Sequence, residues 1–403
     1  MKPTKQLSAL QRQQNINYTQ NTLFDLVVIG GGITGAGIAF DAASRGLKVA
    51  LFEMQDFAAG TSSRSTKLIH GGLRYLKQLE VNLVREVGKE RAILHHNAPH
   101  LVRPKKMLLP IIENGSLGKY SSSFGLYVYD WLAGVDKTER RSMHNKSDTL
   151  ALEPLLRDDI VVGGGLYYEY QTDDARLCIE VLKTAAKYGA TALNYTEVIS
   201  YTYDKEGIVN GVQLVDRLKQ QAFTVKTKKV VNATGPWVDK LRQKDQSVKG
   251  KRLHLTKGVH IVVPYHKLPL QQACYFDVQD GRMIFAIPRA DTTYIGTTDT
   301  NYTDDIIRPE ITQNDAQYII EATNCIFPSV KLTISDIISS WAGLRPLIHE
   351  DGKSPSELSR KDEIFYAESG LISIAGGKLI GFRKMAERVV NVVIKQLYIE
   401  TDR

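Results

Sequence analysis

Two short apolar runs near the start of the chain flank a segment of small and apolar residues. The runs are Leu26–Ile29 and Val49–Phe52, and the segment Ala36–Arg45 between them is typical of a helix that ends before Gly46. Short apolar runs are typical of buried strands, and a helix between two such strands is the usual crossover in a parallel sheet. The pattern therefore predicts a βαβ unit.

Three glycines follow the first predicted strand directly, at Gly30, Gly32 and Gly35. Glycine at these positions permits a tight turn, lets backbone N–H groups approach a pyrophosphate, and lets the helix pack close to the strand. Glu53 ends the second strand, where a carboxylate accepts a hydrogen bond from an adenosine ribose hydroxyl. Because strand, glycines, helix, strand and acid occur in the required order, we predict a dinucleotide site.

The next segments alternate between helical and extended patterns. Val81–His96 has amphipathic helical spacing, Lys105–Ile112 is typical of a strand, and the pair Asp173-Asp174 is placed to cap a further helix. Tyr120–Leu132 is rich in aromatic residues, which fits core packing, a face of a substrate domain or a membrane-contacting surface. The polar segment Met1–Gln20 indicates an N-terminal arm, either mobile or a short surface helix.

The second half of the chain is rich in short strand patterns. A small-residue turn follows one of them at Thr234–Trp237, and Gly376-Gly377 follows another before a closing helix at Phe382–Tyr398. We interpret both turns as returns of the chain to the nucleotide site, with a mixed or antiparallel sheet of a second domain between them. The predicted strands are Ala192–Ile199, Gly207–Val215, Ala222–Lys228, Leu253–Val263, Gln272–Phe276, Met283–Pro288 and Tyr294–Thr297.

Composition narrows the class of protein. The chain has 403 residues, of which 43% are hydrophobic and 24% charged, which is ordinary for a globular protein of two or three domains. Its three cysteines lie far apart without a second metal-ligating residue at the spacing of a zinc site, so neither a disulfide framework nor a metal is predicted. No apolar stretch reaches the roughly 20 residues of a membrane span, and the N-terminus lacks an apolar signal core. We therefore expect a cytoplasmic protein.

The net charge of +8 favours anionic partners: a phosphorylated substrate, anionic lipid or nucleic acid. The charge is spread along the chain, so a solvated basic surface explains it equally well. No RNA-binding motif or basic helix is present, and we expect no nucleic-acid partner.

The order of the motifs resembles the two-domain flavin oxidoreductases of the glucose-inhibited division and D-amino-acid oxidase type. A chain that begins with the nucleotide motif and returns to a Gly-Gly turn near its end is typical of them. More specifically, it resembles the aerobic, respiratory FAD-dependent glycerol-3-phosphate dehydrogenase family. The motifs that carry this resemblance are Thr61–Ser63 with Lys67–Leu76, Asp173–Leu177, Thr234–Trp237, Lys257–His260, Gly296–Asp299, Trp341–Leu347 and Gly376–Leu379.

The resemblance implies oxidation of sn-glycerol 3-phosphate to dihydroxyacetone phosphate, with hydride transfer to non-covalent FAD and electrons passed to a membrane quinone. It also implies peripheral attachment at the inner face of the cell membrane, and leaves a homodimer open. The nearest alternative is a glycerol-3-phosphate oxidase that makes hydrogen peroxide. Oxidases often carry an insertion where this chain has only Ile348–Leu358, which favours the dehydrogenase. A non-catalytic flavoprotein with a basic interaction surface is the distant alternative.

The implied fold is α/β, with a Rossmann-like FAD domain and a mixed-sheet substrate domain. We predict an N-terminal arm at 1–20, a discontinuous FAD domain at 21–100, 150–250 and 340–403, and a substrate domain at 101–149 and 251–339. Two departures from the family concern the end of the chain. It stops at Arg403, where the family continues into a helical C-terminal domain. Ile380-Gly381-Phe382 also replaces the usual hydroxyl residues and aromatic, which leaves flavin contacts there to the backbone.

The implied cofactor site draws on every part of the predicted FAD domain. Its expected residues are Gly30, Gly32, Ile33, Thr34, Gly35, Glu53, Thr61, Ser62, Ser63, Lys67, Leu68, Ile69, His70, Val198, Ala233, Thr234, Gly235, Trp237, Gly343, Arg345, Gly376, Gly377, Lys378, Leu379 and Ile380.

Oxidation of a secondary alcohol needs a base for the hydroxyl proton, and histidine is the usual choice near neutral pH. His70 lies within the family signature and is our predicted base, with His260 as the competitor and a predicted substrate contact.

A phosphate dianion is best held by several cations, because arginine supplies two donors and lysine a point charge. By resemblance the candidates are Arg74, Arg345, Arg360 and Lys378, with Tyr75 beside them. Arg345 is also a predicted catalytic residue, since a cation near the flavin stabilises its reduced, anionic form.

Overall fold

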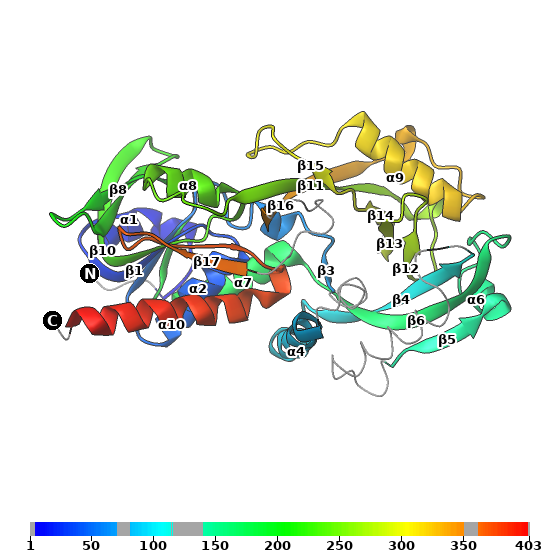
Figure 1. Cartoon of the computed structure of the whole chain (residues 1–403), viewed down its shortest axis with the longest axis horizontal. Coiled ribbons are helices and arrows are strands. Elements are labelled where there is room, and N and C mark those ends of the chain that lie inside the picture. The colour runs from blue at the N-terminus through cyan, green and yellow to red at the C-terminus, as the bar shows by residue number, and fades with distance from the viewer. Residues whose placement is uncertain (1–4, 71–80, 114, 116–139, 350–361, 402–403) are drawn as a thin grey trace.

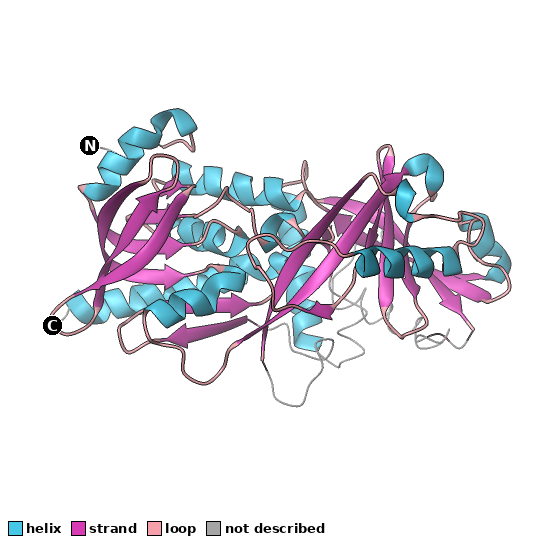
Figure 2. Cartoon of the chain, turned by 90° about the horizontal axis from the view of Figure 1, so that it is seen from above, coloured by secondary structure: helices cyan, strands magenta, loops and turns pink. Residues whose placement is uncertain are grey.

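The computed structural model describes residues 5–70, 81–113, 115, 140–349 and 362–401. Two large sheets dominate these residues and lie toward opposite ends of the long axis of the molecule (Figures 1 and 2). One has eight strands, in the order β17-β18-β10-β1-β2-β7 with β9 and β8 continuing from β10, and the other has ten. The predicted α/β class with mixed sheets is confirmed.

The eight-stranded sheet carries the predicted βαβ unit. Strand β1 (Leu23–Ile29) pairs in parallel with β2 (Val49–Phe52) and with β10 (Gln221–Asn232), and helix α2 (Ile33–Ser44) connects the first two. The apolar run of β1 is buried on both faces, as expected for a strand at the centre of a parallel sheet. The other strands are β7 (Thr191–Leu193), β8 (Thr196–Tyr203), β9 (Val209–Asp216), β17 (Asp362–Tyr366) and β18 (Ile372–Gly376).

Helices cover one face of this sheet. Leu26 and Val28 of β1 share a buried cluster with α2, α7 (Asp174–Lys187) and α10 (Phe382–Thr401), and α10 runs beneath the sheet in Figure 1. Gly37 of α2 lies against the Phe382 ring, where a larger side chain would collide. The closing helix α10, predicted from sequence at Phe382–Tyr398, thus packs directly on α2.

On the opposite face, side chains of β1 and β2 pack against side chains of the antiparallel strands β8 and β9, which continue the sheet from β10. Helix α1 (Arg12–Gln20), which follows the short turn η1 (Ala9–Gln11), packs in the same cluster. Arg12 donates to the carboxylate of buried Asp216 at 2.7 Å and to the carbonyl of Asn194 at 2.7 Å. The part of the N-terminal arm that the structure describes is therefore a helix anchored on the sheet.

The ten-stranded sheet is built around β11 (Leu253–Pro264), which pairs with β14 (Thr292–Gly296) and β16 (Ser339–Ile348). Helix α9 (Gln313–Ile326) packs on one face of this sheet. The remaining strands are β3 (Leu68–Ile69), β4 (Arg103–Ile112), β5 (Ser142–Asn145), β6 (Val161–Gln171), β12 (Ala273–Asp277), β13 (Met283–Arg289) and β15 (Thr300–Asn301).

The other described helices are α4 (Val81–Asn97), α6 (Lys146–Leu152) and α8 (Val238–Lys244), with the short turns η2 (Thr61–Ser63), η4 (Gly235–Trp237), η5 (Tyr265–Lys267), η6 (Ile334–Asp336) and η7 (Leu379–Gly381). Asp173 caps α7, as predicted, by accepting from the backbone N–H of Arg176.

The domain limits remain a prediction, but three strands belong to a different sheet from the one that these limits imply. Strands β3 and β6 and nearly all of β16 fall within the segments assigned above to the FAD domain, yet all three hydrogen-bond in the ten-stranded sheet. The chain crosses between the sheets within these segments, and an apolar strand pattern does not say which sheet a strand joins. The aromatic segment Tyr120–Leu132 lies outside the described residues.

Candidate active site

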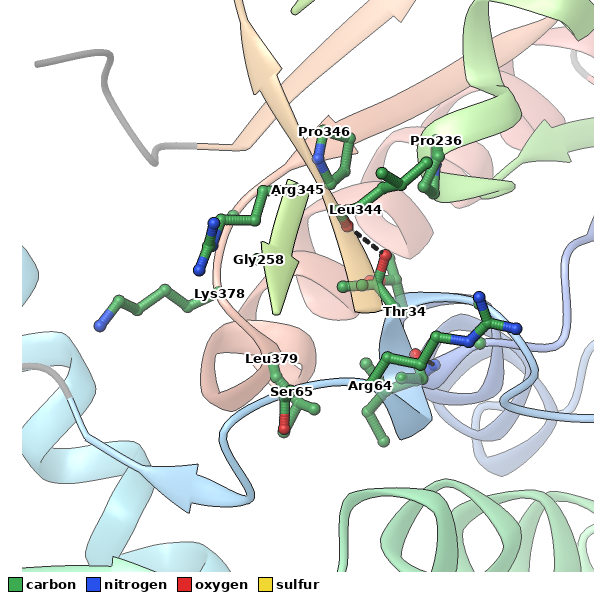
Figure 3. Close-up of a pocket in the computed structure, with 18 of the residues that line it drawn as sticks. Thr34, Arg64, Ser65, Pro236, Gly258, Leu344, Arg345, Pro346, Lys378 and Leu379 are labelled. Atoms are coloured by element: carbon green, nitrogen blue, oxygen red, sulfur yellow. Dashed lines mark hydrogen bonds between the residues drawn. The ribbon is translucent and has the colours of Figure 1, made fainter. Parts of the chain in front are cut away.

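A cavity of about 960 Å³ lies where the two sheets meet. One end is lined by the glycine loop before α2, and the other by β11, β13 and β16. Figure 3 shows Thr34 of α2, Gly258 of β11 and Arg345 of β16 around one space. The volume is at the upper end of the range for small-molecule sites, which suits a ligand as large as a dinucleotide together with a small substrate.

The glycine loop has the backbone geometry that its sequence requires. Gly30 has φ +109°, and a Cβ there would collide with the carbonyl of Ala233. A Cβ on Gly35 would collide with the carbonyl of Gly30. Glycine is needed at both positions because β10 and α2 approach the turn so closely.

Glu53 is held by the same loop. Its carboxylate accepts from the N–H of Gly31 at 2.7 Å and from the N–H of Gln55 at 2.8 Å. Burial raises the pKa of Glu53, while these backbone donors act in the opposite direction. Hydrogen bonding keeps the carboxylate at the end of β2, where it lines the cavity.

Two later turns complete the nucleotide end. The amide of Asn232, at the end of β10, donates to the carbonyl of Val238 and to the hydroxyl of Ser373 on β18. Gly376 and Gly377 then turn away from β18 with φ of +77° and +76°, in the left-handed region that glycine adopts readily. Both turns line the cavity, as the sequence predicted.

Arg345 points into the opposite end of the cavity from β16 (Figure 3). Its guanidinium pairs with Asp299 at 3.0 Å and donates to the hydroxyl of Thr297 at 3.0 Å. Gly258 of β11 leaves room for it, because a Cβ there would collide with the guanidinium. Lys378 lies at the same end, and its ammonium donates to the carbonyl of His70 at 2.9 Å.

The two candidate histidines have different surroundings. His260 is fully buried and stacks on Trp341, with ring centroids 4.8 Å apart, and its Nε2 lies 3.0 Å from the hydroxyl of Thr66. Burial, together with the positive charges of Arg345 and Lys67, lowers the pKa of His260 to about 3. His260 is therefore neutral at physiological pH.

His70 lines the cavity too, but it is only partly buried. Its ring meets the edge of Phe285 at a centroid distance of 5.2 Å.

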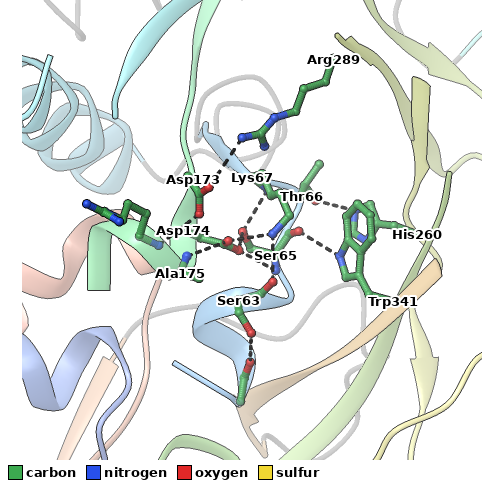
Figure 4. Close-up of polar contacts among 12 residues, drawn as sticks. Ser63, Ser65, Thr66, Lys67, Asp173, Asp174, Ala175, His260, Arg289 and Trp341 are labelled. Atoms are coloured by element: carbon green, nitrogen blue, oxygen red, sulfur yellow. Dashed lines mark hydrogen bonds and ion pairs between the residues drawn. The ribbon is translucent and has the colours of Figure 1, made fainter. Parts of the chain in front are cut away.

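An ion pair between the partly buried Lys67 and the buried Asp174 stabilises the loop between η2 and β3. Lys67 donates to Asp174 at 2.8 Å and to the carbonyl of Ser63 at 2.9 Å, and Asp174 also accepts from Ser65. Figure 4 shows how Trp341 joins this cluster to His260: its ring donates to the Ser65 carbonyl and stacks on the imidazole. The loop and the buried histidine are thereby fixed together.

Most of the predicted cofactor residues line the cavity, and four do not. Lys67 is directed to Asp174, Ser63 serves as its backbone partner, Gly35 packs beneath Gly30, and Ile69 belongs to the core. These four residues do not line the cavity but support the residues that do. The lining includes Gly30, Gly32, Ile33, Thr34, Glu53, Thr61, Ser62, Leu68, His70, Val198, Ala233, Thr234, Gly235, Trp237, Gly343, Arg345, Gly376, Gly377, Lys378, Leu379 and Ile380, together with His260.

Three predicted substrate residues, Arg74, Tyr75 and Arg360, lie outside the described residues. Conversely, the cavity is lined by side chains that the sequence did not single out: Arg64, Thr66, Tyr167, Glu169, Arg217, Tyr275, Arg282 and Phe285. Arg64 and Thr66 stand between the two parts of the family motif, Thr61–Ser63 and Lys67–Leu76, so their position was a usable signal. The others lie on strands and turns whose patterns indicate only burial or exposure.

Comparison with known proteins agrees with this geometry. Residues 25–383 match the protein family described as FAD dependent oxidoreductase. The chain is 57% identical over 398 residues to the aerobic glycerol-3-phosphate dehydrogenase of Bacillus subtilis, covering 99% of this chain and 72% of that protein. The chain belongs to the aerobic glycerol-3-phosphate dehydrogenase family. The corresponding protein of Staphylococcus aureus is also 57% identical, over 97% of this chain and 70% of its own length.

Solved structures of this family and its neighbours have the same fold. Glycerol-3-phosphate dehydrogenase from Bacillus halodurans, complexed with FAD, superposes with a TM-score of 0.82 at 52% identity, covering 97% of this chain and 68% of that one. L-α-glycerophosphate oxidase from Mycoplasma pneumoniae gives a TM-score of 0.73 over 92% of this chain and 95% of its own, but at 19% identity this likeness concerns the fold alone.

Two features are absent from the described part of the chain. None of its helices is long and apolar enough to cross a membrane. Within the same residues, no group of three His, Cys, Asp or Glu side chains is arranged to hold a metal ion.

Proposed function

We propose that this chain binds FAD non-covalently and oxidises sn-glycerol 3-phosphate to dihydroxyacetone phosphate. The observation that carries the proposal is a single cavity that joins a dinucleotide loop to an end lined by Arg345, Lys378 and two histidines. It occurs in a chain that is 57% identical to aerobic glycerol-3-phosphate dehydrogenases.

The residues at the nucleotide end fit FAD. Gly30 and Gly32 of the glycine loop line the cavity, Gly30 makes a turn that has no room for a side chain against Ala233, and Glu53 lines the cavity at the end of β2. The turns at Thr234-Gly235 and Gly376-Gly377 line the same cavity. Bound FAD would supply the hydride acceptor, its N5 atom, for the carbon that carries the reacting hydroxyl.

Cations at the other end would hold the substrate phosphate. Arg345 and Lys378 line the cavity, and Arg74, Arg360 and Tyr75 are proposed to act with them by resemblance. The ion pair with Asp299 fixes the direction of the Arg345 guanidinium, so less side-chain entropy is lost when the phosphate binds.

We assign the base to His70. A base whose conjugate acid has a pKa of about 3 takes a proton from an alcohol poorly, and this argues against His260. His70 lies in the same cavity and is less buried. His260 is then a neutral side chain that lines the site and orients substrate through hydrogen bonding and packing.

The final electron acceptor is proposed to be a membrane quinone, with the protein attached peripherally to an anionic membrane surface. The net charge of +8 supports such attachment. An oxidase would return the electrons to oxygen instead.

The deciding experiment is anaerobic mixing of the flavin-loaded protein with glycerol 3-phosphate while flavin absorbance is followed. We expect rapid bleaching, and an absence of bleaching would refute the proposed reaction. Parallel assays for hydrogen peroxide and for reduction of an artificial quinone then identify the acceptor. Peroxide formation at the rate of substrate oxidation would support the oxidase.

The base is tested by comparing His70→Asn and His260→Asn in the same rapid-mixing experiment. Loss of the base should slow flavin reduction by roughly 10²- to 10⁴-fold with little change in substrate binding. A slower reduction in the His260 variant alone would move the base to His260.

A further inference from the structure

We propose that Arg64 binds the pyrophosphate of FAD, in addition to the backbone donors of the glycine loop. This inference rests on the proposed function in one respect, namely that the cavity takes FAD. Arg64 ends the short turn η2 and lines the cavity, and Ser62 of the same turn accepts a hydrogen bond from the N–H of Ile33 beside the glycine loop.

The glycine loop has fewer available N–H groups than its sequence implies. The N–H of Gly30 donates to the carbonyl of Phe52, that of Gly31 to Glu53, and that of Ile33 to the hydroxyl of Ser62. Three donors at this turn are thus used within the protein. A pyrophosphate carries two negative charges, so a cation beside the loop would add a charge-assisted contact to the remaining N–H donors.

Among the described arginines that line the cavity, Arg64 is the one that remains for this role. Four arginines of the described residues line the cavity, and three of them have a carboxylate partner: Arg217 pairs with Glu197, Arg282 with Asp280, and Arg345 with Asp299. The two other lining carboxylates are also engaged, Glu53 by backbone N–H groups and Glu169 by Arg91.

Arg64 has no hydrogen-bond or ion-pair partner for its guanidinium within the described part of the chain, although it is about half buried. Burial lowers the pKa of Arg64, and no neighbouring carboxylate counteracts this effect. A partly buried arginine without an acid is unfavourable unless an anion binds there.

The direction of the Arg64 side chain favours the cofactor pyrophosphate over the substrate phosphate as its anion. In Figure 3, Arg345 and Lys378 lie together on one side of the site, and Arg64 extends on the other side, away from them. The backbone of Arg64 is fixed by close packing against Gly343 of β16, where a Cβ would collide with it. The hydroxyl of Thr61, in the same turn, donates to the Leu344 carbonyl at 2.7 Å. Substrate phosphate and cofactor pyrophosphate would therefore be held by different cations.

The test measures binding of FAD, ADP and adenosine to flavin-free protein by calorimetry. For Arg64→Met we expect FAD and ADP to bind about 10- to 150-fold more weakly, the range for one lost charge-assisted contact. Adenosine, which has no phosphate, should bind as it does to the unmodified protein. Arg64→Lys should restore part of the ADP affinity, because it keeps the charge and loses the fork geometry.

Arg217→Met is the matched control, since Arg217 lines the same cavity but is already paired with Glu197. It should change the preference for ADP over adenosine much less than Arg64→Met does. An Arg64→Met variant that keeps the full preference for ADP over adenosine would overturn the proposal. Failure of the unmodified protein to bind FAD would instead refute the proposed function, so the two failures are distinguishable.

Discussion

At the residue scale, Arg345 is expected to contribute more to substrate binding than to cofactor binding. Arg345→Ala should lower kcat/KM about 30- to 150-fold, because one charge-assisted contact to phosphate contributes on the order of 2–3 kcal/mol. The measurement is steady-state kinetics on protein with a full complement of FAD. Arg345→Lys controls for the loss of the ion pair with Asp299, since it keeps a positive charge there. An unchanged kcat/KM in a folded Arg345→Ala variant would exclude Arg345 from the site.

His260 should make the protein less stable in acid. Its pKa is about 3 in the folded protein and near 6.5 when unfolded, so between these values the unfolded state binds more protons. Stability therefore falls as pH drops from about 6.5 toward 3, by at most about 1.4 kcal/mol per pH unit from this residue. Urea unfolding at pH 6.5 and 5 should give a smaller difference for His260→Gln than for the unmodified protein. Exposed His266 provides the control, because His266→Gln should leave the difference unchanged.

At the scale of elements, the two turns that connect α2 to β1 and to β2 contain glycine for different reasons. Gly30 and Gly46 have φ of +109° and +88°, but a Cβ on Gly30 would meet the Ala233 carbonyl, whereas a Cβ on Gly46 meets open space. Gly46→Ala should lower the free energy of unfolding by about 1–2 kcal/mol, the strain of a left-handed residue. Gly30→Ala adds a collision to that strain, so we expect a larger loss and weaker FAD binding. Denaturant unfolding and flavin titration measure both effects, and equal losses for the two variants would contradict the collision.

At the scale of the whole molecule, the predicted membrane attachment should depend on salt. A protein with a net charge of +8 is attracted to anionic lipid, and screening weakens this attraction as ionic strength rises. We expect cosedimentation with vesicles containing phosphatidylglycerol at low salt and release at roughly 0.5 M salt, with neutral vesicles as the control. Equal recovery with anionic and neutral vesicles would contradict electrostatic attachment.

The sequence by itself determined the βαβ unit, the glycine turns, the cap of α7 and the family. These features depend on short stretches of chain: a strand pattern, a helix period, a glycine where φ must be positive. The 57% identity to relatives then agrees with motifs that were visible along the chain. Local steric rules and local hydrogen bonds are sufficient for such features.

Only the tertiary structure decided how the charged side chains are paired. Lys67 meets Asp174 across 107 positions of sequence, and Arg345 meets Asp299 across 46. Lys67 therefore fixes a loop instead of lining the cavity, and Arg64 is the arginine of the described lining that has no acid. Burial of His260 beside Trp341 and Thr66, together with the charges of Arg345 and Lys67, likewise lowers its pKa. Ion pairing and desolvation depend on which distant segments come together, and the periodicity of a single strand or helix does not contain that information.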